Sequence, residues 1–96
     1  MVNEYKLIMT IKSSKPMVHI LVMKSFLKQL KKEKKKKPDL LFSVNPKDEK
    51  TTQLDIWCDE KFMNEAKKDW TRLKTKAQRK FSSTFGIKME LNVEKL

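Results

Sequence analysis

Every second residue between Tyr5 and Ile11 is apolar, and this alternation (YKLIMTI) predicts a strand with one buried face. Three further segments have the pattern of short strands: residues 40–44 (LLFSV), 53–58 (QLDIWC) and 87–93 (IKMELNV). The second and third predicted strands are separated by NPKDEKTT, which is rich in turn-forming residues and predicts a connecting turn.

Two longer segments have the 3.6-residue period of helices. The first follows residues 13–16 (SSKP), which offer cap candidates and a proline suited to a first helical turn. It should end near Lys37, because Pro38 disfavours helix in the residue before it. The second helix should begin at residue 59 or 60 and end at Gly86, the only glycine of the chain, which suits a C-cap.

The predicted order of elements is therefore β-α-β-β-α-β in a single domain spanning residues 1–96. Two β-α-β units with right-handed crossovers predict an α+β fold of the ferredoxin-like type. This is a two-layer sandwich in which a four-stranded antiparallel sheet carries two helices on one face. Because such a superfold hosts many unrelated activities, it identifies no function.

The two helices differ in how clearly they define a buried face. The second has one apolar stripe, which predicts a core of Phe62, Ala66, Trp70, Leu73 and Ala77 flanked by Met63 and Phe81. For the first helix the expected inward face is Ile20, Met23, Phe26, Leu27 and Leu30. Val18, Leu21 and Val22 would then point away from the core, so we expect either the C-terminal residues or another chain to cover them. Of these two, the sequence favours a homodimer interface.

Positive charge dominates the composition. The chain has 23 lysine and arginine residues against 12 aspartate and glutamate residues, a net charge of +11. The excess lies on the two predicted helices: residues 28–37 hold seven lysines and one glutamate, and residues 60–80 hold eight cations and three acids. This distribution favours an anionic partner, and nucleic acid above all. A lysine-rich coding bias is the competing explanation.

Three groups of cations are candidate phosphate contacts. The first is a ridge about 27 Å long on the second helix, formed by Lys61, Lys68, Arg72 and Arg79 with Lys76 at its flank. The second is the lysine run at the end of the first helix, expected to overhang the sheet: Lys31, Lys32, Lys34, Lys35, Lys36 and Lys37. The third lies at the start of the first helix, where a phosphate could meet Lys12, Lys15 and Lys80. The preferred interpretation is a small non-enzymatic nucleic-acid-binding protein, with RNA slightly preferred over DNA because no major-groove motif appears.

Trp57 is expected to point outward from a central strand, beside Asp55. It is open to three interpretations: a base-stacking residue, a contact in a sheet-mediated dimer, or an ordinary side chain that is exposed or covered by a loop. With Val18, Leu21 and Val22 it supports the alternative function, a protein-interaction module that binds itself or an acidic protein, as an assembly subunit or a small inhibitor would.

Residues with catalytic or metal-binding chemistry are scarce. His19 is the only histidine and falls beside the buried stripe, so a packed core residue is expected rather than a general base. Cys58 is the only cysteine, which excludes an internal disulfide and suits a reducing compartment. We therefore expect no enzyme activity, no metal and no cofactor. With no signal peptide and no apolar run of the ~20 residues that a membrane span needs, a soluble intracellular protein, cytoplasmic or nuclear, is expected.

Overall fold

In a computed structural model the described residues are 3–80 and 87–96, without the side chains of residues 71, 73, 74 and 76–80. The elements in chain order are β1 (Tyr5–Lys12), α1 (Pro16–Lys36), β2 (Leu41–Asp48), β3 (Thr51–Cys58), α2 (Glu60–Lys80) and β4 (Lys88–Lys95). This order confirms the predicted α+β class. The description does not cover the expected cap Gly86, or the side chains of three expected core residues, Leu73, Ala77 and Phe81.

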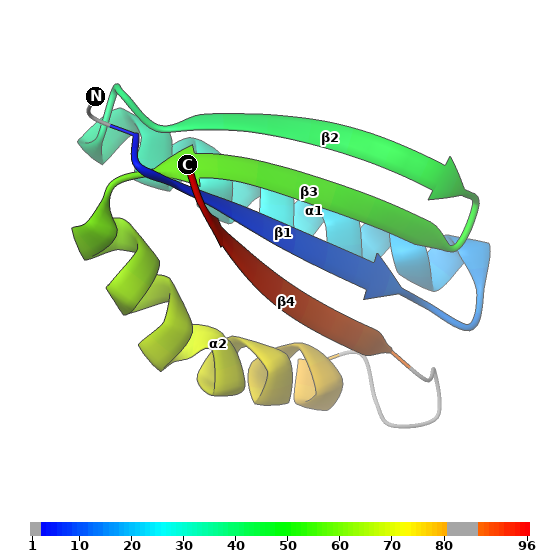
Figure 1. The fold of residues 1–96 in the computed structure, drawn as a ribbon. Coiled ribbons are helices and arrows are strands. Elements are labelled where there is room, and N and C mark those ends of the chain that lie inside the picture. The colour runs from blue at the N-terminus through cyan, green and yellow to red at the C-terminus, as the bar shows by residue number, and fades with distance from the viewer. Residues whose placement is uncertain (1–2, 81–86) are drawn as a thin grey trace.

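The four strands form one antiparallel sheet in the order β2-β3-β1-β4. Figure 1 shows the sheet in front of α1, with β2 and β4 as its two edge strands. Buried residues of both helices join a single cluster with one face of the sheet, so the two helices cover the same face.

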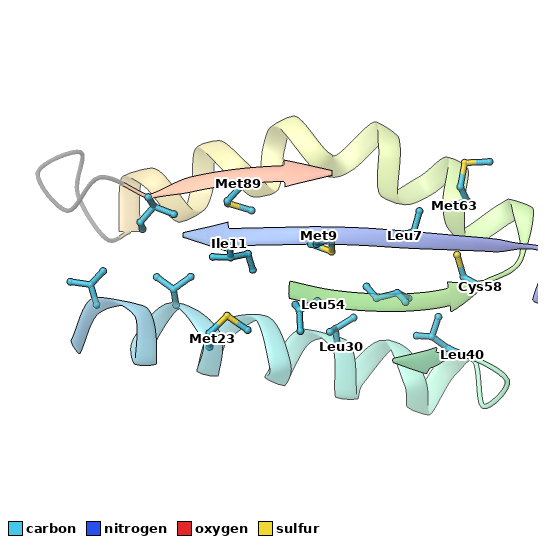
Figure 2. Packing of buried hydrophobic residues seen from close by; sticks show 14 residues of the cluster. Leu7, Met9, Ile11, Met23, Leu30, Leu40, Leu54, Cys58, Met63 and Met89 are labelled. Atoms are coloured by element: carbon cyan, nitrogen blue, oxygen red, sulfur yellow. The ribbon is translucent and has the colours of Figure 1, made fainter. Parts of the chain in front are cut away.

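The core follows the predicted alternation of the central strands. Figure 2 shows the buried side chains that fill the space between sheet and helices. The strands contribute Leu7, Met9, Ile11, Leu54, Ile56, Cys58 and Met89, and the helices contribute Val18, Val22, Met23, Leu30 and Met63. Burying these apolar side chains is the main source of stability, at about 1.5–3 kcal/mol for each fully buried large one.

Asp59 directly precedes α2 and caps it, and the helix begins at Glu60, within the range that the sequence predicts. Its Oδ1 accepts a hydrogen bond from the backbone N–H of Phe62 at 2.8 Å, and its carbonyl accepts one from Met63 at 3.0 Å. The first contact satisfies an N–H group that has no backbone partner within the helix, and the second is the first i to i−4 bond of the helix.

The β2–β3 hairpin is longer than the sequence predicts. Strand pairing continues through Asn45 and Pro46, with an irregularity between Pro46 and Asp48, and β3 already begins at Thr51. The turn is therefore confined to residues 49–50, closed by a 2.8 Å hydrogen bond from the Lys50 N–H to Asp48 Oδ1. Pro46 is tolerated because β2 is an edge strand, where a missing N–H costs little.

The orientation of α1 corrects the sequence prediction. Val18 and Val22 are 7% and 0% exposed, so they are core residues and not available to a partner. Ile20, expected inside, is 56% exposed, and Leu21 is 54% exposed. The helix is thus turned so that the side containing Val18 and Val22 faces the sheet.

Hydrogen bonds of His19 explain this orientation. The imidazole lies between two hydroxyl groups, with Nδ1 3.0 Å from Ser13 Oγ and Nε2 2.7 Å from Thr52 Oγ1. All three side chains are buried, with at most 5% of their surface exposed. A buried polar ring needs such partners, and facing them brings the neighbouring Val18 and Val22 inward. His19 is therefore a packed residue, as its position on the helix predicted.

Candidate nucleic-acid interface

The outer side of α1 carries a straight line of lysines. We call Lys24, Lys28, Lys31 and Lys35 the α1 stripe; all four are exposed. At 100° per residue they fall within about 60° of one another, and 11 residues of helix separate the first from the last by about 17 Å. None of the four side chains has a hydrogen bond or ion pair with another described residue. The stripe is therefore an array of uncompensated charge.

Lys24 and Lys28 were missed by the sequence analysis, which considered only the lysine run. Their signal was present in the spacing, because positions 24, 28, 31 and 35 follow the i, i+4, i+7, i+11 pattern of one helix face. Only the observed rotation of α1 shows that this face points to solvent.

Only part of the lysine run projects away from the fold. Its members Lys31, Lys32, Lys35 and Lys36 are exposed. Lys34 instead turns back, and its Nζ donates a 2.7 Å hydrogen bond to the Leu40 carbonyl. The expectation that all six lysines project into water is therefore wrong for Lys34 and also for Lys37.

Lys37 lies against the first turns of α2. Its Nζ is 3.9 Å from Glu65 Oε2 and 5.2 Å from the centre of the Phe62 ring, and it makes no hydrogen bond. The chain reverses direction between the end of α1 and the buried Leu40, which places the last lysine of the run beside α2. Lys37 thus belongs to the packing between the helices and is removed from the candidate phosphate contacts.

The ridge on α2 is present where the structure describes it. Lys61, Lys68 and Arg72 are exposed, whereas Trp70 is half-buried against the core. None of these three cations pairs with an acid among the described residues. The side chains of Lys76 and Arg79 lie outside the description.

The open face of the sheet is close to neutral. Cross-strand neighbours on it are Trp57, Lys6 and Glu94 in one row, then Asp55, Ile8 and Asn92, then Gln53, Thr10 and Glu90. A fourth row places Lys12 beside Lys88. Three lysines therefore face three acids on this side, in contrast to the helix layer.

Asp55 is 7% exposed although it lies on the open face. Its two carboxylate oxygens accept hydrogen bonds from Asn45 Nδ2 at 2.8 Å and Gln53 Nε2 at 3.0 Å. Sequence reasoning missed this cluster, because Asn45 was assigned to a turn rather than to β2. Nearby, the Nζ of Lys6 lies 5.3 Å from the centre of the half-buried Trp57 ring. One face of the indole thus already contacts a cation, which leaves less of it for a base.

At the start of α1, Lys12 and Lys15 are exposed, while the side chain of Lys80 lies outside the description. Lys15 is the N-cap residue and makes no side-chain capping hydrogen bond. The Ser13 hydroxyl is engaged by His19 and does not face solvent. Two of the three predicted lysines of this loop are thus placed on the surface.

The groups with acid–base chemistry are buried in the core. Burial lowers the pKa of His19, against an opposing effect of Asp48. Burial raises the pKa of Cys58 to about 11; Asp59 adds to the rise and Lys37 opposes it. No three histidine, cysteine, aspartate or glutamate residues in the described part of the chain are grouped as metal ligands.

Within residues 3–80 and 87–96, neither helix is long and apolar enough to cross a membrane. Comparisons of the chain with protein families, with characterised proteins and with solved structures found no match.

Proposed function

We propose that this protein is a small, non-enzymatic nucleic-acid-binding protein that contacts phosphate groups through its helix layer. The observation that carries the proposal is the α1 stripe: four exposed lysines in line, without acidic partners among the described residues. The α2 ridge, represented by Lys61, Lys68 and Arg72, adds three exposed cations on the same layer.

The geometry of the α1 stripe favours a regular polyanion over a compact acidic partner. A duplex carries about one negative charge per 1.7 Å of its axis with both strands counted, so the 17 Å of duplex alongside the stripe holds on the order of ten phosphates. Each lysine can then find a phosphate without a specific register. Contacts of this kind position the protein on the backbone but read no sequence. RNA remains slightly preferred over DNA, because the helices present no major-groove reading motif.

We further propose that the fold is of the ferredoxin-like type. Support comes from the strand order β2-β3-β1-β4, in which each β-α-β crossover skips one strand, and from the packing of both helices on one sheet face. In this arrangement the sheet leaves one face open and the helices form the other surface, so the two surfaces can carry different charge.

A salt titration of binding to a duplex RNA and to a duplex DNA tests the function. Because each phosphate contact releases counterions, affinity should fall steeply as salt rises. Protein purified at low salt should also carry nucleic acid that is released at high salt, seen as a falling 260/280 absorbance ratio. An affinity that is independent of salt would contradict the proposal.

A second candidate function, a protein-interaction module, is favoured by exposed apolar residues at the start of α1. Met17, Ile20 and Leu21 are 80%, 56% and 54% exposed and lie on the same side of the helix as the α1 stripe. Such a surface suits an acidic peptide with apolar side chains at one end. Of the partner residues expected from the sequence, only Leu21 and the half-buried Trp57 remain available.

The two candidates differ in the effect of Leu21→Ser. If an acidic protein is the partner, wild type should bind an acidic peptide containing leucines more tightly than its leucine-free equivalent, and Leu21→Ser should remove the difference. RNA affinity should be unchanged by this substitution. Equal affinity of the wild type for the two peptides would rule against the protein-interaction candidate.

A further inference from the structure

We propose that the free edge of β4 pairs with β4 of a second copy, joining two sheets across a two-fold axis at Leu91. This inference is independent of the proposed nucleic-acid binding. It rests on three features of β4: the direction of its free backbone groups, the self-complementary order of its side chains, and the difference between the two edges of the sheet.

Along its outer side, the backbone of β4 offers a regular row of groups that pair with no other described strand. Within residues 3–80 and 87–96, β4 pairs only with β1, and at its end the Leu96 N–H donates a 2.8 Å hydrogen bond to the Glu4 carbonyl. In an antiparallel pair the direction of these groups alternates along the strand. The even-numbered residues of β4 therefore bond to β1, and Met89, Leu91 and Val93 direct their N–H and C=O groups to the free edge. Figure 1 shows β4 at this edge of the sheet.

The side chains at this edge match a second copy in one register. With Leu91 opposite Leu91 of the second copy, Met89 lies opposite Val93, and about six backbone hydrogen bonds can form. Leu91 and Val93 are half-buried, so pairing would cover apolar surface that a single copy leaves exposed. On the open face the same register places Lys88 opposite Glu94 twice, with each Glu90 opposite an Asn92.

Neighbouring registers are less favourable. A shift of two residues in one direction places Glu90 opposite its own copy, and a shift in the other direction places Glu90 opposite Glu94 twice. Like charges directly opposite each other destabilise a strand pair, and opposite charges stabilise it by roughly 0.2–1 kcal/mol each. The charges of β4 therefore oppose slippage.

Lys88 and Glu94 are free to make these contacts. Both are exposed and neither has an ion pair with a described residue. On β1 the neighbour of Lys88 is another cation, Lys12, and the neighbour of Glu94 is Lys6, whose ammonium lies over the Trp57 ring. Neither edge charge therefore has an ion-pair partner among the residues that the structure describes.

The other edge of the sheet differs. β2 contains Pro46 and an irregular register between Pro46 and Asp48, both of which hinder pairing with another strand. β4 pairs with β1 in unbroken register and contains no proline. Of the two edge strands, β4 is therefore the one whose sequence allows regular pairing with a second copy.

Charge exchange tests the interface and its register together. Nuclease-treated wild type should dimerise across a concentration series in sedimentation equilibrium. Lys88→Glu alone places two carboxylates opposite each other at both ends, and Glu94→Lys alone does the same with two ammonium groups. Each should raise the dimer dissociation constant roughly tenfold or more. An equimolar mixture of the two variants restores both opposite-charge pairs and should recover the wild-type value.

Both substituted residues are exposed, and circular dichroism should show that each variant is folded. The proposal is overturned if the wild type stays monomeric throughout the series, if either single variant dimerises as well as the wild type, or if mixing gives no recovery. As a second measurement, Leu91→Cys should form a disulfide across the axis, because directly paired Cα atoms lie about 5.5 Å apart. Glu90→Cys, whose copies are offset along the strands, should not.

Discussion

Removing three lysines of the α1 stripe gives the most direct test of how the protein would bind nucleic acid. We expect the Lys24→Gln, Lys28→Gln, Lys31→Gln variant to fold normally. Its substituted side chains are exposed and have no partner among the described residues, and lysine and glutamine have similar helix propensities. Any change in binding then reports the lost charge.

The expected magnitude follows from the number of exposed cations. The four lysines of the α1 stripe and the three described cations of the α2 ridge give seven phosphate contacts and a log–log salt slope of about −6.3 on a duplex, at −0.9 per contact. Over a fourfold rise in salt, affinity should fall by a factor on the order of 6,000. Without three of the lysines the slope should be about −3.6, and the loss over the same range only about 150-fold.

The assay is fluorescence anisotropy with a labelled duplex at a series of salt concentrations. A matched control is Lys47→Gln, Lys50→Gln, Lys95→Gln, which removes the same charge from exposed residues of the hairpin and of β4. The control should retain nearly the full slope. If both variants flatten the slope equally, only net charge matters, and the assignment of binding to the helix layer is refuted.

Three other predictions concern the core. Leu54→Ala should lower the free energy of unfolding by about 2–5 kcal/mol, because Leu54 is 0% exposed. Leu21→Ala, at a residue that is 54% exposed, should change it by less than about 0.5 kcal/mol. Urea denaturation compares the two variants, and equal losses of stability would contradict the assigned burial. Because burial lowers the pKa of His19 in the folded state, the unfolded chain binds the proton first, and stability should decline as pH falls below about 6.5. Urea denaturation at several pH values should show this decline, and His19→Gln should remove most of it. If the stability of the variant and of the wild type depends on pH in the same way, His19 does not cause the decline. Cys58 should resist a thiol reagent at pH near 8 until the protein unfolds, since burial raises its pKa to about 11. Rapid reaction of the thiol in the folded protein would contradict the burial of Cys58.

Much of the fold could be predicted from the sequence because short-range patterns carry it. The alternation in β1 and β3 gave the correct inward residues, and Trp57 and Asp55 point outward as expected. Pro38 and Asp59 marked the ends of helices through local backbone chemistry. The predicted turn of the hairpin was too long, because its residues favour turns locally. Only pairing with β3 extends β2 to Asp48.

The candidate site was predicted less completely. Exposure of Lys61, Lys68 and Arg72 followed from the single apolar stripe of α2. On α1 the apolar residues surround the first turns, so periodicity alone could not select the inward side. The rotation that buries Val22 and exposes Lys24 was therefore missed, as was the return of Lys37 onto Phe62.

The sequence by itself determined the succession of strands and helices, the excess of positive charge and its location on two helical segments. These depend on residues close together in the chain, whose periodicity and charge can be read directly. The tertiary structure alone decided which side of α1 faces water, because the imidazole of His19 binds a hydroxyl group on Thr52, 33 residues away. It also decided that β4 is an edge strand of the described sheet, since the order of strands in a sheet depends on how distant segments pack together.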